Sequence, residues 1–191
     1  DHLIGLAKNG EKELTNPIDF SSASYPIVFG SIKNEILIKN CHSVDHFQAD
    51  SCVIELIEKI GGNIRNTDNG LLISPAKLSA FEFDCLDCPD LVPSLVFLAL
   101  NVDGKSKLKN LSVLRHKESD RIEEILKITK KIGDVCLYNE ELDELIIEGE
   151  NHLKSATSFK LPADHRMIFL ASMILRVGKV SGSVNNYLHV N

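Results

Sequence analysis

Residues 115–121 interleave basic and acidic side chains just before a run with helical apolar spacing, residues 122–132. A helix N-terminus has unpaired backbone N–H groups and a partial positive charge, so it attracts anions. With Lys117 and Arg121 beside it, this helix start could bind a phosphate or a carboxylate, and Glu118 between them is a candidate for proton transfer. The alternative is a capped, solvated helix start, because runs of charge usually face solvent.

Similar polar groups stand at the start of other predicted helices. They are Ser21, Ser22 and Tyr25; Asp90; and Asp164, His165 and Arg166. Serine and aspartate are common N-caps, a role also open to Ser119 or Asp120, and a histidine such as His165 is more often packed than catalytic. Arg121 and Arg166 are harder to explain as caps, because a cation in the first turn opposes the helix dipole unless an anion is nearby. These arginines therefore favour a polyanionic ligand.

The elements that would position these groups form a repeat of strand, helix, strand, helix and two short strands, roughly 70 residues long. In the first copy we expect a helix from residue 21 to about 32, a strand at 35–40, a helix over 49–60 and strands near 63–65 and 71–73. The second copy has a strand at 81–84, a helix over 89–99, a strand at 107–110, a helix over 119–132 and strands at 135–137 and 144–147. A third copy supplies a strand at 158–161, a helix from 163 and a strand near 180. This order predicts an α/β (α+β) fold, with a boundary between units at 75–80.

The composition is that of an ordinary globular protein with a net charge of -6, which argues against a general nucleic-acid binder. No apolar run is long enough to span a membrane, and no signal peptide is evident. Five cysteines in a chain of 191 residues are best explained as reduced thiols in the cytoplasm. Cys85 and Cys88 have the spacing of half a zinc site, but without a second such pair we expect no metal. The absence of an initiating methionine suggests a piece of something longer.

Four sequence pieces occur in a fixed order: Ser21-Ser22-Ala23-Ser24-Tyr25, Pro89-Asp90, Arg115-x-Lys117-Glu118-Ser119-Asp120-Arg121 and Asp164-His165-Arg166-Met167. In this combination, the chain from about residue 20 onward resembles the 5-enolpyruvylshikimate-3-phosphate (EPSP) synthase family. The resemblance implies the enolpyruvyl transferase fold, with two domains of three repeat units each. Residues 1–75 would then be the last unit of the N-terminal, shikimate-3-phosphate-side domain, and residues 76–191 a C-terminal domain incomplete at its end.

The reaction that the resemblance implies is transfer of the enolpyruvyl group of phosphoenolpyruvate to the 5-hydroxyl of shikimate 3-phosphate, with release of phosphate. It also implies no cofactor, no nucleic-acid or membrane partner, a monomeric full-length cytoplasmic enzyme, and a glyphosate target. By the family's pattern, Asp90 is the base at the shikimate hydroxyl and Glu118 transfers a proton at the methylene carbon. Lys117 lies near the bridging oxygen and shares proton transfer.

The same resemblance assigns the binding residues. Arg121 and Arg166 match the guanidiniums that hold phosphoenolpyruvate, a task suited to a planar bidentate fork. The implied contacts to shikimate 3-phosphate are Ser21, Ser22 (on its phosphate), Tyr25, Asp90 and Lys117. The implied supporting residues are Asp164, His165 and Arg115.

Two departures from the family pattern matter. Val113 stands where some members have Asn, and several basic, glycine and serine ligands would belong to segments outside this chain. We therefore expect the 191-residue chain alone not to turn over. The alternatives are an enolpyruvyl transferase acting on UDP-N-acetylglucosamine, a non-catalytic module whose anion sites dock a phosphorylated partner, and a degenerate enzyme. Glu118 argues against the anion-binding module, because a pure anion binder gains nothing from a carboxylate beside its cations.

Overall fold

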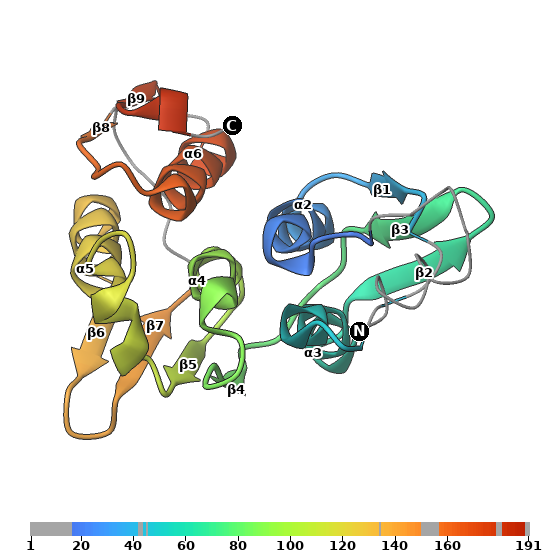
Figure 1. Ribbon diagram of the computed structural model, residues 1–191, viewed down its shortest axis with the longest axis horizontal. Coiled ribbons are helices and arrows are strands. Elements are labelled where there is room, and N and C mark those ends of the chain that lie inside the picture. The colour runs from blue at the N-terminus through green and yellow to red at the C-terminus, as the bar shows by residue number, and fades with distance from the viewer. Residues whose placement is uncertain are drawn as a thin grey trace, which may run out of the picture.

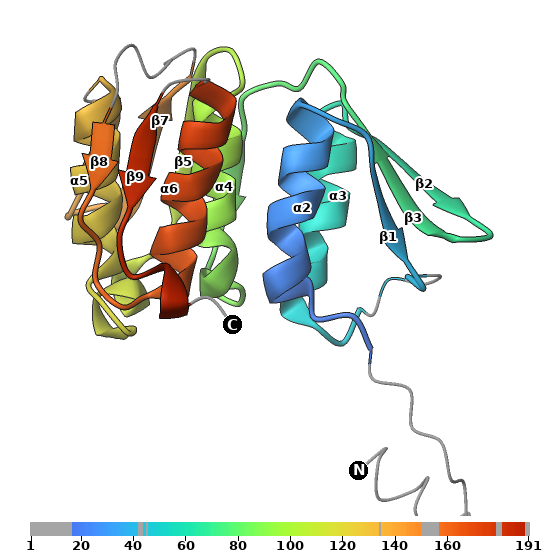
Figure 2. The same cartoon turned by 90° about the horizontal axis from the view of Figure 1, so that it is seen from above.

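The computed structural model describes residues 17–41, 44, 46–133, 135–149, 157–178 and 181–189. Two groups of helices and strands lie next to each other, joined by residues 75–81 (Figure 1). Seen from above, helices of both groups stand roughly parallel in the middle, and the three-stranded sheet of the first group lies on the outside (Figure 2). The two groups meet where α2 packs against α4. No helix in the described ranges is both long and apolar enough to span a membrane.

The first group is one repeat unit. Its elements are α2 (Phe20–Ile32), β1 (Ile36–Lys39), the 3₁₀ turn η1 (Ala49–Ser51), α3 (Cys52–Lys59), β2 (Asn63–Thr67) and β3 (Gly70–Ser74). The strands form an antiparallel sheet in the order β1-β3-β2. The cap of α2 is Asp19, whose carboxylate accepts a hydrogen bond from the Ser21 backbone N–H at 3.0 Å, so Ser22 is not the N-cap.

The second unit repeats this plan with an added parallel strand. Its elements are β4 (Glu82–Asp84), η2 (Pro89–Leu91), α4 (Val92–Leu100), β5 (Lys105–Lys109), η3 (Ser112–His116), α5 (Arg121–Ile132), β6 (Cys136–Asn139) and β7 (Glu144–Glu148). The sheet order is β4-β5-β7-β6, with β4 parallel to β5 and the other pairs antiparallel. The third unit contributes β8 (Thr157–Phe159), α6 (His165–Gly178), β9 (Gly182–Val184) and η4 (Tyr187–His189), with β8 parallel to β9.

The predicted order of elements is confirmed, but four helices begin two or three residues later than expected. The helix expected from residue 49 opens with η1, so α3 begins at Cys52, and the helix expected from residue 163 begins at His165. The helix expected from residue 119 begins at Arg121, and its N-cap is Asp120, whose carboxylate accepts from the Glu123 N–H at 3.0 Å. The helix expected from Pro89 opens with a 3₁₀ turn, and α4 proper begins at Val92. The third-unit strand expected near residue 180 begins at Gly182, and residue 180 itself lies outside the described ranges.

The first and second units share a backbone detail at the ends of the equivalent strands β1 and β5. Asn40 after β1 and Asn110 after β5 both take the left-handed conformation, with φ of 60° and 61°. The Asn40 N–H donates to the Asn69 carbonyl at 3.3 Å, and the Asn110 N–H donates to the Asp143 carbonyl at 3.0 Å. In each unit the strand end is thus tied to the turn between the two closing strands.

The interior is built around α4, whose nine residues are all buried. An apolar helix without a polar face must be covered on all sides, and α2, α6 and the sheet strands β5 and β7 provide that cover. Aromatic rings connect the units: Phe29 stacks near Phe97 with centroids 6.3 Å apart, and Tyr25 lies 4.9 Å from Phe169. These ring contacts hold α2 along α4 and α6, and α2 also contacts η2, the turn that carries Asp90.

Candidate active site

Six charged residues from three segments of the chain converge in one cluster. They are Asp90, Lys117, Glu118, Arg121, Asp164 and Arg166. Asp90 comes from η2, the middle three from the end of η3 and the start of α5, and the last two from the start of α6. Because three helix starts point to one place, residues up to 76 positions apart are brought into contact.

Arg121 is the centre of this cluster, and its side chain is only 1% exposed. Its Nε donates to Asp164 Oδ2 at 2.9 Å and its Nη1 donates to Asp90 Oδ1 at 2.9 Å. Its Nη2 donates to Glu118 Oε2. A buried guanidinium needs such partners, because an unpaired charge in the interior is very costly.

Asp90 faces all three cations of the cluster. Arg166 Nη2 lies 3.3 Å from Asp90 Oδ2, Lys117 Nζ lies 3.3 Å from Oδ1, and Arg166 Nη1 also donates to the Asp90 backbone carbonyl at 3.2 Å. Partial burial alone would raise the pKa of Asp90, but the charges of Arg166 and Lys117 and the hydrogen bonds from Lys117 and Arg121 outweigh it. The pKa of Asp90 is therefore below its ordinary value.

Asp164 positions both arginines. It is fully buried, accepts from Ser119 Oγ at 2.9 Å, and caps α6 by accepting from the Arg166 backbone N–H at 3.0 Å. Burial would raise its pKa, but the hydrogen bond and charge of Arg121 dominate, so the pKa of Asp164 is lowered. Asp164 thus acts both as a helix cap and as an ion-pair partner.

These contacts correct one step of the sequence argument. The cations at the starts of α5 and α6 were expected to require an outside anion. Instead, the three cations Lys117, Arg121 and Arg166 face three carboxylates of the chain itself, as described above. The dipole argument alone therefore does not call for a ligand here.

Beside the cluster lies an open pocket of about 290 Å³ between the two units. Its lining residues are Ser21, Gln48, Ala49, Asp50, Asp87, Pro89 and Asp90. The Ser21 hydroxyl donates to the Asp50 carboxylate. Burial raises the pKa of Asp50, and the nearby negative charge of Asp90 adds to this effect. The hydrogen bond from Ser21 opposes it only in part. Ser22 does not line the pocket, because its hydroxyl donates to Asp19 at 2.6 Å on the exposed start of α2.

The Tyr25 hydroxyl is buried and makes no hydrogen bond of normal length and angle among the described residues. Burial raises the pKa of Tyr25 above its ordinary value, and the charge of Arg166, a weak hydrogen-bonding interaction with the Arg166 side chain and the charge of Arg121 offset this only in part. A buried polar group without a partner costs free energy. Tyr25 therefore reaches from α2 towards Arg166 without a well-formed hydrogen bond.

Two of the predicted supporting residues take no part in the hydrogen bonds and ion pairs described above for this centre. Arg115 pairs with Asp120 at 3.0 Å and Glu140 at 3.2 Å, and its guanidinium lies 5.2 Å from the Tyr138 ring centroid. It braces the start of α5 against the β6–β7 hairpin. His165 is the half-buried first residue of α6.

Sequence reasoning missed Asp50 and Gln48 and treated Ser119 only as a possible cap. Gln48 fixes the start of α2, accepting from the Phe20 N–H at 3.1 Å and donating to the Ile18 carbonyl at 2.8 Å. Asp50 lies in the first turn of a helix, as Asp90 does. Selecting polar residues at helix starts, which identified Asp90, would therefore also have identified Asp50.

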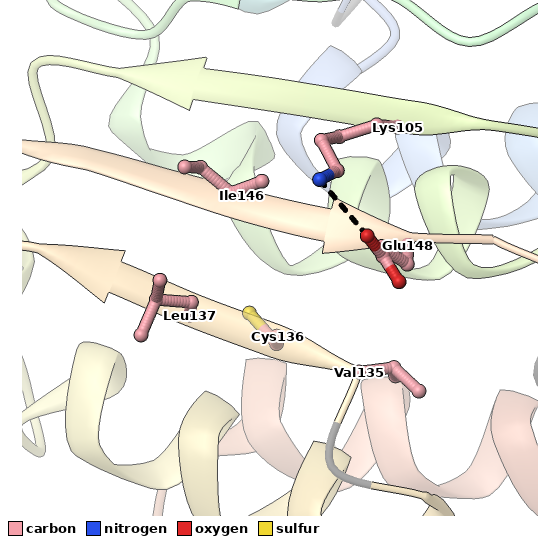
Figure 3. Close-up of a pocket in the computed structure, with 6 residues that line it drawn as sticks. All are labelled: Lys105, Val135, Cys136, Leu137, Ile146 and Glu148. Atoms are coloured by element: carbon pink, nitrogen blue, oxygen red, sulfur yellow. Dashed lines mark ion pairs between the residues drawn. The ribbon is translucent and has the colours of Figure 1, made fainter.

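A second pocket, of about 270 Å³, is far from this cluster in the fold. Figure 3 shows it on the sheet formed by β5, β7 and β6, lined by apolar side chains and by the ion pair of Lys105 with Glu148 at 2.9 Å. This ion pair is exposed, and the pocket lining holds no further charged group. Within the described ranges, no group of three or more His, Cys, Asp or Glu side chains is placed to hold a metal ion.

The fold is that of the enolpyruvyl transferases. Over 93% of the chain and 40% of the other protein, it matches the enolpyruvyl transferase NikO from Streptomyces tendae, with a TM-score of 0.63 and 14% identity. An EPSP synthase from Acinetobacter baumannii matches over 91% of this chain and 43% of its own length, with a TM-score of 0.71 and 20% identity.

Sequence comparison identifies the particular family. Residues 3–185 match the family model of EPSP synthase (3-phosphoshikimate 1-carboxyvinyltransferase), and the chain belongs to this family. A 3-phosphoshikimate 1-carboxyvinyltransferase from Methanococcus maripaludis is 38% identical over 78% of the chain, and one from Halorubrum lacusprofundi is 29% identical over 93%. The chain spans only 34% and 40% of these two relatives. The matches support this family over the UDP-N-acetylglucosamine transferase considered above.

Proposed function

We propose that this chain contributes one side of an active site that transfers the enolpyruvyl group of phosphoenolpyruvate to the 5-hydroxyl of shikimate 3-phosphate. In this proposal residues 1–75 are the last unit of the shikimate-3-phosphate-side domain and residues 76–191 belong to the C-terminal domain. The whole enzyme works as a cytoplasmic monomer and is a glyphosate target. The observation that carries the proposal is the convergence of Asp90, Glu118, Arg121 and Arg166 beside a pocket between the two units.

Binding of phosphoenolpyruvate would exchange internal ion pairs for pairs with the substrate. Its carboxylate and phosphate are the anions that the planar guanidiniums of Arg121 and Arg166 bind best. As these arginines turn to the substrate, Asp90 loses two of the three cations that lower its pKa. Asp90 then becomes a stronger base at the moment when the shikimate hydroxyl must give up its proton.

The proton transfers follow from this arrangement. Asp90 takes the proton of the 5-hydroxyl while the hydroxyl oxygen forms a bond to C2 of phosphoenolpyruvate. At the same time, Glu118 gives a proton to the methylene carbon, C3. The product is a tetrahedral ketal phosphate with a methyl group. Glu118 then takes a proton back from that methyl group as the C–O bond to phosphate breaks. Lys117, whose Nζ lies 3.3 Å from Asp90 Oδ1, relays the proton held by Asp90 to the bridging oxygen of the leaving phosphate, so both carboxyl groups return to their starting states. Ser21 and Tyr25 contact shikimate 3-phosphate, and Ser22 joins them when its hydroxyl turns from Asp19 to the substrate phosphate. Asp164, His165 and Arg115 support the site.

Glu118→Gln tests the proposal in a hybrid that completes the chain with the remaining segments of the Methanococcus maripaludis relative. Loss of the proton donor is expected to lower kcat by about 10²- to 10⁴-fold, while the Kd for shikimate 3-phosphate changes less than about twofold. The matched control is Glu140→Gln, an exposed carboxylate that pairs only with Arg115 among the ion pairs described, which should leave kcat unchanged. Full activity of Glu118→Gln, or loss of binding without loss of kcat, contradicts the role of Glu118.

A further inference from the structure

Three cysteine side chains gather beside the pocket, outside the proposed reaction. Cys52 Sγ lies 3.6 Å from Cys88 Sγ in a thiol–thiol hydrogen bond, although the two residues are 36 positions apart. Cys85 is fully buried three residues before Cys88. Cys52 belongs to the first unit and the other two belong to the second, so this contact spans the two units.

Backbone hydrogen bonds hold the Cys88 side of the contact in place. The Cys85 N–H donates to the Lys109 carbonyl at the end of β5 at 3.0 Å, and the Cys88 N–H donates to the Cys85 carbonyl at 3.2 Å. Cys88 Sγ also lies 3.9 Å from the Asp84 carbonyl. The thiol of Cys88 is therefore fixed relative to the second sheet, pointing at Cys52.

The two thiols have different reactivities. Cys52 is partly exposed and is the first residue of α3, which continues directly from η1. The hydrogen bond with Cys88 lowers the pKa of Cys52, although burial and the charges of Asp50 and Glu55 oppose this. The same hydrogen bond, together with burial, raises the pKa of Cys88, and burial raises the pKa of Cys85 to about 12. Cys52 is thus both the more accessible of the two thiols and the one that ionises more readily.

We propose that Cys52 and Cys88 form a reversible disulfide when the protein meets a peroxide, and that this disulfide links the two units at the edge of the pocket. The Cys52 thiolate attacks one oxygen of hydrogen peroxide, forming a sulfenic acid and releasing hydroxide. Cys88 then attacks the Cys52 sulfur and the S–O bond breaks. The departing hydroxyl group takes the proton of the Cys88 thiol and leaves as water, and the hydroxide from the first step takes up the proton lost by Cys52. Overall, two thiols are oxidised by one peroxide, which is reduced to two waters. The two sulfurs need to close from 3.6 Å to about 2 Å.

The position of this link gives it a structural effect. Asp50, two residues before Cys52, and Asp90, two residues after Cys88, lie in opposite walls of the pocket. A disulfide would fix these walls at one separation, and a thiol reductant would release them. The prediction of the disulfide depends only on the thiol geometry and not on the reaction assigned to the pocket.

The test is a peptide map of the purified 191-residue chain before and after treatment with hydrogen peroxide, with the remaining thiols then alkylated. The expected result is an intramolecular Cys52–Cys88 peptide in most of the protein, reversed by dithiothreitol, in wild type and equally in Cys85→Ser and Cys136→Ser. Cys52→Ser and Cys88→Ser should each abolish that peptide. Recovery of Cys52 and Cys88 as separately alkylated or oxidised residues, or a link that forms only between molecules, overturns the proposal.

A second measurement checks that the link constrains the fold. The oxidised chain should show a higher urea midpoint than the reduced chain, because the closed loop restricts the unfolded state. The increase should disappear in Cys88→Ser treated in the same way. An unchanged midpoint with the disulfide fully formed contradicts the proposed bracing of the two units. Neither measurement uses a substrate, so failure of the enolpyruvyl-transfer proposal would leave both results unaffected.

Discussion

Arg121 Nε lies 2.9 Å from Asp164 Oδ2, and the two side chains are 1% and 0% exposed. This buried ion pair joins the first residue of α5 to the residue that caps α6. Burying two charges has a large desolvation cost, which good geometry and additional hydrogen bonds only partly offset. The pair is therefore better explained by the positions it gives to Arg121 and Arg166 than by a gain in stability.

Removing one member of the pair should be strongly destabilising. Asp164→Asn leaves the buried guanidinium of Arg121 short of a counter-charge and is expected to lower the free energy of unfolding by about 3–5 kcal/mol. Urea denaturation of the two proteins measures the difference. The control is Glu140→Gln, at an exposed ion pair, which should cause no measurable loss. Equal midpoints for Asp164→Asn and wild type would show that the pair does not support the fold.

Stability should also fall in acid in a way that depends on Asp164. Its pKa is lower in the folded chain than its ordinary value of about 3.9. Such a carboxyl releases its proton more readily when folded, so it stabilises the fold above the ordinary pKa and loses this contribution as the pH falls through the folded pKa. The free energy of unfolding between about pH 5 and pH 2 should therefore fall less steeply in Asp164→Asn than in wild type. Parallel curves would place the acid sensitivity in other carboxyls.

Tyr25→Phe should affect stability and binding in opposite directions. Removing a buried hydroxyl that makes no well-formed hydrogen bond is expected to leave the free energy of unfolding unchanged or to raise it by up to about 1 kcal/mol. If the hydroxyl serves a substrate, the same change weakens the binding of shikimate 3-phosphate several-fold in the hybrid enzyme described above. Calorimetric titration and thermal unfolding of one preparation give both values. Weaker binding together with a large loss of stability would instead indicate a hidden structural partner.

Gly70 should not tolerate a side chain. Its φ is +130°, and an added Cβ would lie 2.1 Å from the Ile38 carbonyl oxygen, because β1 passes directly beside this turn. Gly70→Ala is expected to lose about 3 kcal/mol or more of unfolding free energy. Gly104→Ala is the matched control: its φ is +103°, but its Cβ would meet only the Ala80 Cβ at 3.3 Å, so strain alone should cost about 1 kcal/mol. Similar losses for both variants would mean that the contact with β1 relaxes easily.

Local sequence patterns predicted most of the fold, because each unit is built from elements with clear apolar spacing. The α3 and α5 helices have one apolar face, and Gly61 and Gly133 follow close after their ends with positive φ. The helix starts were accurate only to two or three residues. Capping depends on which nearby carboxylate reaches the backbone, as Asp19 and Asp120 do here.

The contents of the candidate site were less predictable. A dipole argument applied to Arg121 alone indicates a missing anion, but the carboxylate that meets its Nε comes from residue 164, 43 positions later. The contacts of Ser21 with Asp50 and of Cys52 with Cys88 likewise join residues 29 and 36 positions apart. Such pairs arise from how helices and units pack, which periodicity within one helix does not report.

The left-handed asparagines Asn40 and Asn110 have a consequence for how such a chain can grow. The backbone N–H of each asparagine bonds to the hairpin turn of its own unit, which helps to set the strand register of that sheet. The residues that align each sheet therefore lie within the same unit. A duplicated segment would bring its own alignment with it and would need only a new neighbour for its apolar helices. Duplication of a unit would therefore leave the strand register within each sheet intact, whereas inserting a residue between Asn110 and β5 would disrupt a whole sheet.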